Sequence, residues 1–313
     1  MHERNLGDTD LRLSEITLGT WGLSGAYGPM VESLVTNTVE AALDAGITTY
    51  DVAPLWGDME ETLGAILSES DVDTKVITRA GVLLEDGELL QRYDSDSLKA
   101  DLERSLERLK RDTIDIWLLH DPPMETLEHE EDEDSIFQRT AKIAEAGGVT
   151  HWGVASAIPE VLEKALEAGA KAICVPHHIF ASDLVDDLRE AIDGAGAGVL
   201  ARSPLCHGLL TGRWTEYRRF AMDDHRSERW NAQALAIRVR QVAQLRFLVK
   251  EQVKSLTSAA LRFTLDAPPV TTAILGARRP AQIRGLDDLV GQPPYMEEPD
   301  RVRLAQILAA MDA

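Results

Sequence analysis

Short apolar segments recur eight times along the chain, and an amphipathic helical pattern follows most of them. Runs of this length that end at turn residues are typical of parallel strands buried on both faces. Eight strand–helix repeats predict an α/β fold, a closed (β/α)8 TIM barrel, formed by residues 1–313 as a single domain. The predicted strands are residues 15–19, 47–52, 75–81, 113–121, 149–156, 172–178, 198–204 and 270–276.

An open, doubly wound sheet is the alternative that the same alternation allows. Such nucleotide-binding sheets carry a Gly-x-Gly-x-x-Gly turn after the first strand, and the stretch LGTWGLSG lacks it. Two segments exceed the repeating unit. Residues 1–14 predict a hairpin, with Gly7 near its turn, that closes the bottom of the barrel. Residues 207–245 predict a long loop after the seventh strand that serves as a lid or a cofactor clamp.

The chain carries a net charge of −21, with 53 acidic and 32 basic residues. This charge disfavours nucleic acid or an anionic membrane as a partner, and no apolar run approaches the roughly 20 residues of a membrane span. Two distant cysteines, Cys174 and Cys206, and an N-terminus unlike a secretory signal predict a cytoplasmic protein without disulfides. Nothing in the sequence predicts the oligomeric state.

No metal site is predicted. The acidic run at residues 125–134 is typical of a solvated loop and helix start. His177 and His178 are adjacent in a predicted strand, so their side chains point to opposite faces and do not readily share one ion. We expect them to contribute packing or polarity at the rim of the barrel.

Polar side chains stand at the carboxyl ends of the predicted strands, which converge on one face of a barrel. Asp51, Arg79 and His120 end the second, third and fourth strands. Charged residues in apolar runs are costly to bury unless they are paired. Asp51 and Arg79 are therefore either an ion pair that fixes strand register or part of a reactive site, and His120 beside them favours the site.

Several motifs occur together in a characteristic order and spacing: LRLSEITLGTWGLSG, AALDAGITTYDVAPLWG, LERSLERLKRDTIDIWLLHDP, HWGVASAIPEVLEKAL, LARSPLCHGLLTGRW and AILGARRPAQI. With them the sequence resembles the aldo/keto reductases over nearly its whole length. The resemblance implies a (β/α)8 barrel that binds NADPH in an extended pose. It also implies reduction of an aldehyde or ketone, as the small-molecule substrate, by hydride transfer without a metal.

The family's active site combines Asp, Tyr, Lys and His, in which the tyrosine donates a proton and the lysine lowers its pKa. The resemblance places Asp51 and His120 at two of these positions, Trp56 at the tyrosine and Arg79 at the lysine. An indole N–H releases no proton near neutral pH, and a guanidinium stays protonated. Because losing a general acid costs about 10²–10⁴-fold in rate, we expect an altered proton path, with a protonated His120 as the available acid.

The resemblance also implies positions for the cofactor. Arg202 replaces the aromatic residue that stacks on the nicotinamide, and Ser203 and Leu205 match the segment over the pyrophosphate. The adjacent Arg278 and Arg279 match the clamp on the adenosine phosphate and suit a 2′-phosphate. Ser156 and Cys174 depart from the Asn and Gln that hold the carboxamide. The predicted cofactor-binding residues are Trp21, Ser156, Cys174, Arg202, Ser203, Leu205, Gly276, Arg278, Arg279 and Gln282.

Three functions are compatible with these residues. The first is an NADP(H)-dependent oxidoreductase with an altered proton-donor site, acting on a carbonyl, hydroxyl or sugar-like substrate, with WGLSGAYGPM as a substrate-pocket loop. The second is a non-catalytic NADPH-binding sensor or regulatory protein, because the tyrosine and lysine are missing. The third is a non-redox lyase or isomerase that uses His120 and Asp51 as its acid/base pair.

Overall fold

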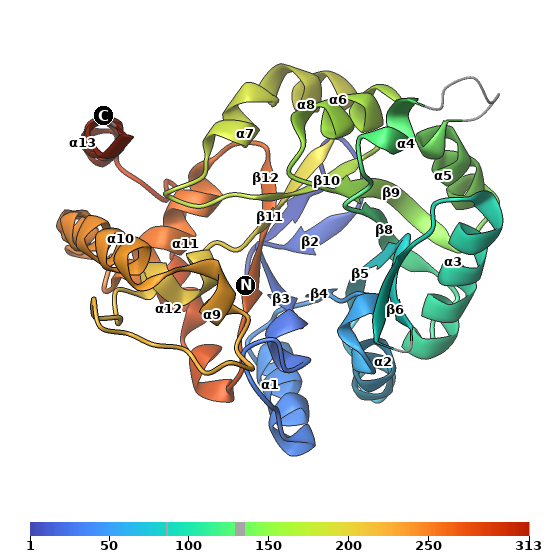
Figure 1. The fold of residues 1–313 in the computed structure, drawn as a ribbon, viewed down its shortest axis with the longest axis horizontal. Helices are drawn as coiled ribbons and strands as arrows, with labels where there is room; N and C mark the ends of the chain where they lie inside the picture. Colours follow the sequence, from blue (N-terminus) through green and yellow to red (C-terminus); the bar gives the residue numbers. More distant parts are fainter. Residues whose placement is uncertain (86, 129–134, 313) are drawn as a thin grey trace.

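The computed structural model describes residues 1–85, 87–128 and 135–312. Eight strands form a closed barrel in which each strand is parallel to its neighbours (Figure 1). The eight predicted strands and the closed barrel are confirmed, and the open sheet is excluded. Around the barrel the strands are β3(Ile16–Gly19), β4(Thr49–Asp51), β5(Lys75–Ala80), β8(Ile114–His120), β9(Val149–Ala155), β10(Ala172–Pro176), β11(Gly198–Arg202) and β12(Val270–Gly276).

Helices cover the outside of the barrel (Figure 1). In α3, the Asp94 carboxylate caps the first turn by accepting the backbone N–H of Ser97, and Leu98 and Leu102 bury one stripe of the helix. Burial of each such leucine contributes about 1.5–3 kcal/mol. The helices of this layer are α1(Glu32–Asp44), α2(Met59–Ser68), α3(Ser95–Leu109), α4(Glu125–Glu128), α5(Ile136–Glu145), α6(Pro159–Glu167), α7(Asp183–Asp187), α8(Arg189–Ala195), α11(Leu256–Asp266) and α12(Leu286–Val290). Of the predicted acidic loop at 125–134, residues 129–134 lie outside the described residues.

An antiparallel hairpin of β1(Glu3–Asn5) and β2(Arg12–Ser14) closes the bottom of the barrel, as predicted. Leu6, Leu11 and Leu13 form one buried cluster with interior barrel residues such as Ile116. Gly7 turns the chain with a φ of +54°, and a Cβ there would collide with the backbone of Gly196. A second hairpin, β6(Val82–Glu85) and β7(Glu88–Gln91), stands after β5 and was not predicted.

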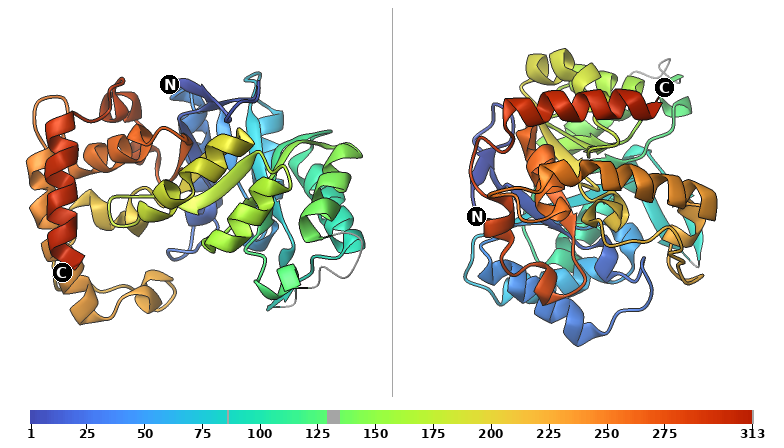
Figure 2. Two further views of the ribbon diagram at one scale, coloured as in Figure 1. Left: turned by 90° about the horizontal axis from the view of Figure 1, so that it is seen from above. Right: turned by 90° about the vertical axis from the view of Figure 1, so that its left-hand side faces the viewer.

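The segment after β11 is more ordered than a loop. It contains α9(Arg226–Arg229), α10(Ala232–Gln244) and short 3-10 turns, η3(Cys206–Thr211) and η4(Leu245–Leu248). A second apolar cluster joins this segment to α11 and to the C-terminal helix α13(Glu298–Asp312), through residues such as Leu235, Leu256 and Leu304. Figure 2 shows α10 and α13 on the same side of the molecule. None of the described helices has the length and apolarity needed to cross a bilayer.

Candidate active site

A cavity of about 430 Å³ opens at the carboxyl ends of the barrel strands. Every strand contributes a residue at or next to its end, because parallel strands of a barrel all finish on this face. These residues are Gly19, Asp51, Arg79, His120, Ala155, Pro176, Arg202 and Gly276. The face that the sequence analysis predicted to carry the chemistry is therefore the face that holds this cavity.

Asp51 and Arg79 form a buried ion pair at the floor of the cavity. The Asp51 Oδ1 and Arg79 Nη1 atoms are 2.6 Å apart, and the side chains are 3% and 4% exposed. Arg79 also donates to the backbone carbonyl of Val52 at 2.8 Å and to the Cys174 sulfur at 3.7 Å. Burial raises the pKa of the Asp51 carboxyl, and the adjacent guanidinium acts in the opposite direction. The pair fixes a positive charge that cannot be given up as a proton.

Trp56 lies over this pair. It ends a short 3-10 turn, η2(Pro54–Trp56), that Pro54 begins and Gly57 follows with a φ of +64°. The turn brings the indole to the cavity wall, where the Arg79 Cζ atom is 4.9 Å from the ring centroid. Such a cation–π contact holds the guanidinium against the ring. The four predicted active-site residues therefore share one cavity.

His120 ends β8 with its side chain 15% exposed. Its Nε2 atom is 3.8 Å from the Asp121 carboxylate. Burial, together with the positive charges of Arg79 and Arg202, lowers the pKa of His120 to about 3. This shift disfavours the imidazolium near pH 7 and so counts against the hypothesis that a protonated His120 replaces the lost acid. The neutral ring still donates one hydrogen bond.

Most of the predicted cofactor-binding residues line the same cavity: Trp21, Arg202, Ser203, Leu205, Gly276, Arg278 and Gln282. Three do not. The Ser156 hydroxyl is buried and accepts the N–H of Ile158, and Cys174 lies beneath the floor against Arg79. Arg279 is exposed outside the lining. The structure thus brings together the central positions and leaves the predicted carboxamide residues out of the cavity lining.

The cavity wall opposite the ion pair carries cations without acidic partners. Among the residues that the structure describes, the side chains of Arg202 and Arg229 make no hydrogen bond or ion pair, and both residues line the cavity. The nearby backbone turns sharply, with positive φ at Ser203, Cys206 and His207. Turns of this kind present N–H groups to anions. This wall is therefore suited to an anionic group such as a phosphate.

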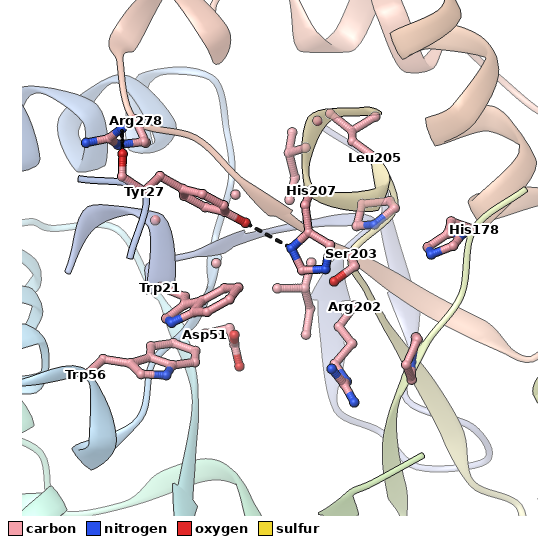
Figure 3. A pocket seen from close by; sticks show the side chains of 18 of the residues that line it. Trp21, Tyr27, Asp51, Trp56, His178, Arg202, Ser203, Leu205, His207 and Arg278 are labelled. Atoms are coloured by element: carbon pink, nitrogen blue, oxygen red, sulfur yellow. Dashed lines mark hydrogen bonds between the residues drawn. The ribbon is translucent and has the colours of Figure 1, made fainter. Parts of the chain in front are cut away.

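The sequence placed the loop after β3 and the long segment after β11 at the pocket, but apart from Trp21 it did not identify which of their residues face the cavity. The hydroxyl of Tyr27 is 3.2 Å from Nδ1 of His207. Figure 3 shows these two side chains meeting beside Trp21 and Arg202. The Arg226 Cζ atom lies 4.5 Å from the Tyr27 ring, and Asp224 pairs with Arg226 at 2.5 Å. The two segments thus join across the cavity through residues far apart in sequence.

Arg278 connects the end of β12 to the loop after β3. Its guanidinium donates to the backbone carbonyls of Tyr27, Gly28 and Pro29 at 2.7, 2.7 and 3.1 Å. In this arrangement the predicted phosphate-clamp residue holds the loop. Gln282 accepts the backbone N–H of Arg278 at 2.8 Å and fixes the turn that follows.

Within the described ranges, no group of three or more His, Cys, Asp or Glu side chains is arranged to hold a metal ion. His177 and His178 face different sides: the His177 ring stacks on Phe263 at 5.6 Å, whereas His178 lines the cavity.

Comparison with known proteins agrees with this architecture. The sequence pattern of the Aldo/keto reductase family matches residues 15–289. An aldo-keto reductase of Bacillus subtilis (strain 168) is 29% identical over 301 residues, which cover 93% of this chain and 89% of that protein. An L-glyceraldehyde 3-phosphate reductase of Escherichia coli (strain K12) is 26% identical over 310 residues, covering 90% and 86%.

A solved structure is also similar throughout. The glycerol dehydrogenase of Gluconobacter oxydans aligns with a TM-score of 0.86 at 28% identity, covering 99% of this chain and 95% of that one. The family pattern spans all eight barrel strands, from the start of β3 to beyond β12. The chain therefore belongs to the aldo/keto reductase family.

Proposed function

We propose that this protein is an NADP(H)-dependent oxidoreductase with an altered proton-donor site, in which residues 1–313 act as a single barrel domain. The observation that carries the proposal is the cavity itself. It combines the buried Asp51–Arg79 pair, Trp56 and His120 with an arginine-bearing wall on the opposite side. A cytoplasmic location is part of the proposal, because Cys174 and Cys206 are both free thiols.

The arginine-bearing wall fits a dinucleotide phosphate. Arg202 and Arg229 line it without acidic partners among the described residues, and Ser203 and Leu205 supply the turn beside them. Exposed Arg279, with no acidic partner in the described part of the chain, would take a 2′-phosphate. The cofactor would supply a hydride. The protein's own contribution is to hold it, to orient the substrate and to exclude water.

The substrate we propose is a small carbonyl, hydroxyl or sugar-like compound. Two of the similar proteins are named for glycerol and for L-glyceraldehyde 3-phosphate, which are small hydroxylated molecules. The neutral His120 and the Trp56 indole each offer an N–H to a substrate oxygen. The fixed charge of Arg79 behind the indole favours negative charge that develops on that oxygen.

Binding titrations with NADPH and NADH, followed by fluorescence or calorimetry, test the cofactor assignment. Arg279→Gln should weaken NADPH binding about 10–100-fold, the loss expected for a charge-assisted contact, and leave NADH binding unchanged. Arg246→Gln removes an exposed arginine of η4 and is the matched control. Failure of the wild-type protein to bind either dinucleotide would overturn the proposal.

A non-catalytic, NADPH-binding regulator is the second candidate. The observation that favours it is that Trp56 and Arg79 place no proton donor beside Asp51. A panel of aldehydes, ketones and sugars with NADPH, and of the corresponding alcohols with NADP⁺, separates the candidates. Tight NADPH binding without turnover on any member of the panel would favour the regulator.

A further inference from the structure

The known residues of the site leave the proton unassigned. Reduction of a carbonyl requires one proton for the oxygen as well as a hydride for the carbon. Trp56 and Arg79 release no proton near neutral pH, and the lowered pKa of His120 keeps that ring neutral. Some other group at the cavity therefore has to supply the proton if the enzyme reduces carbonyls.

Tyr27 is the only phenol among the described residues that line the cavity. Its ring is held from several sides: the centroids of Trp21 and His225 are 5.5 and 4.8 Å away, and the Arg226 Cζ atom is 4.5 Å away. Gly22 lets the ring lie against the backbone, since a Cβ at that position would stand 3.2 Å from it. A ring fixed in this way keeps its hydroxyl in one place.

His207 connects that hydroxyl to a second exchangeable proton. Its Nδ1 atom is 3.2 Å from the Tyr27 oxygen, and its ring lines the cavity. When Nδ1 carries the imidazole proton it donates to the phenol oxygen, and the phenol O–H is then free to point into the cavity. In Figure 3 the two side chains meet above Trp21, with Tyr27 reaching over from the side of Arg278 and His207 from the side of Ser203 and Leu205.

We propose that Tyr27, supported by His207, is the proton donor that replaces the missing tyrosine, and this inference rests on the proposed function. Tyr27 would be a catalytic residue and His207 a positioning residue that returns the proton. Burial raises the pKa of Tyr27, which the Arg226 and Arg229 guanidiniums partly offset, and the net pKa is about 12.

The step balances as follows. The carbonyl carbon accepts a hydride, with its electron pair, from the reduced nicotinamide cofactor, and the carbonyl π electrons move to oxygen. That oxygen takes the proton of the Tyr27 hydroxyl, which leaves a tyrosinate. Nδ1–H of His207 returns a proton to the tyrosinate while Nε2 of the same ring takes a proton from solvent, so the imidazole is neutral before and after the step and no imidazolate forms. The carbonyl compound is reduced by two electrons to an alcohol, and the cofactor is oxidised by two.

Tyr27→Phe is the direct test because it removes one oxygen and keeps the ring. We expect kcat to fall about 10²–10⁴-fold while the Kd for NADPH stays unchanged. The solvent deuterium isotope effect on kcat should change as well, because the proton then comes from another source. Tyr217→Phe is the matched control, since Tyr217 is 85% exposed on the long segment after β11, away from the cavity lining, and it should retain wild-type kcat.

Two further variants separate chemistry from structure. Trp56→Tyr with Arg79→Lys rebuilds a donor at the family position and should restore kcat to Tyr27→Phe. His207→Asn tolerates the left-handed backbone at position 207, where φ is +55°, and should lower kcat by a smaller factor. Nitrogen chemical shifts of His207 should report the lost partner in Tyr27→Phe without any turnover.

Each outcome decides between the proposals. An unchanged kcat in Tyr27→Phe, or a changed NADPH Kd with an unchanged kcat, overturns the role of Tyr27 and leaves the oxidoreductase assignment intact. Unchanged His207 nitrogen shifts in Tyr27→Phe also overturn the pairing. Absence of turnover in the wild-type protein overturns the oxidoreductase assignment, and the proton-donor role fails with it.

Discussion

The two sides of the cavity differ in how their charges are satisfied. On the side of β4, β5 and β8, Asp51 and Arg79 are buried and paired at 2.6 Å. On the side of β11, Arg202 lines the cavity with no hydrogen bond or ion pair among the described residues. On the first side the positive charge is already neutralised by a protein carboxylate, whereas on the second side the guanidinium is still able to bind an anion. Charges that stabilise the fold and charges that await a ligand can therefore be separated by their partners.

Removing one partner of the Asp51–Arg79 pair should have the largest effect on stability. Arg79→Met leaves the Asp51 carboxylate buried without a cation, which should lower the free energy of unfolding by about 3–5 kcal/mol. Urea denaturation followed by circular dichroism measures this change. Asp51→Leu combined with Arg79→Met should recover most of the loss, because it removes both charges together. If the free energy of unfolding falls by less than about 1 kcal/mol in Arg79→Met, the ion pair does not stabilise the fold as expected.

A smaller effect is expected at His177, a buried residue behind the unpaired side. Both of its ring nitrogens lack hydrogen-bond partners among the residues that the structure describes, and burial lowers its pKa to about 4. His177→Leu should raise the free energy of unfolding by about 1 kcal/mol near neutral pH. The unfolded histidine titrates near 6.5, so acid stabilises the unfolded wild-type chain as the pH falls from about 6.5 toward about 4.

The advantage of His177→Leu should therefore grow in acid, by at most about 1.4 kcal/mol per pH unit. Urea midpoints measured at about pH 7 and about pH 5 check the sign. An advantage that shrinks on acidification would show that the folded protein accommodates the imidazolium.

The smallest effect on stability is expected at the unpaired side itself. Arg202→Met should change the free energy of unfolding by less than about 0.5 kcal/mol, because its guanidinium makes no hydrogen bond or ion pair with the described residues and acts on Asp51 and Asp121 only at longer range. NADPH titration of the same variant should show weaker binding. A large decrease in the free energy of unfolding would show that Arg202, like Arg79, stabilises the fold.

The sequence predicted the barrel well because parallel strands buried on both faces leave a strong pattern. All eight predicted strands overlap the observed ones. Asp51, Arg79 and His120 were predicted because each stands at or next to a strand end, and Trp56 because it occupies a position of the family motif that follows β4. These features are local in the chain, so a single sequence is enough to find them.

Other features depend on contacts that a single sequence does not encode. Tyr27 and His207 are 180 positions apart, and nothing in either local stretch indicates the other. The pKa of His120 could not be judged from the sequence because it depends on burial and on two arginines from other strands. The β6–β7 hairpin was missed because its apolar residues, such as Leu84 and Leu89, remain exposed, so they lack the burial pattern of a core strand.

The hairpin of β1 and β2 fills the base of the barrel with leucines. Substrate and product must consequently pass through the mouth that the loop after β3 and the long segment share. The contacts that hold Tyr27 in place lie at this mouth, so we expect them to affect the entry of substrate and the release of product. A substitution at these contacts would change the rate of product release as well as the rate of the chemical step. Steady-state kcat combines the two rates, whereas single-turnover measurements report the chemical step alone.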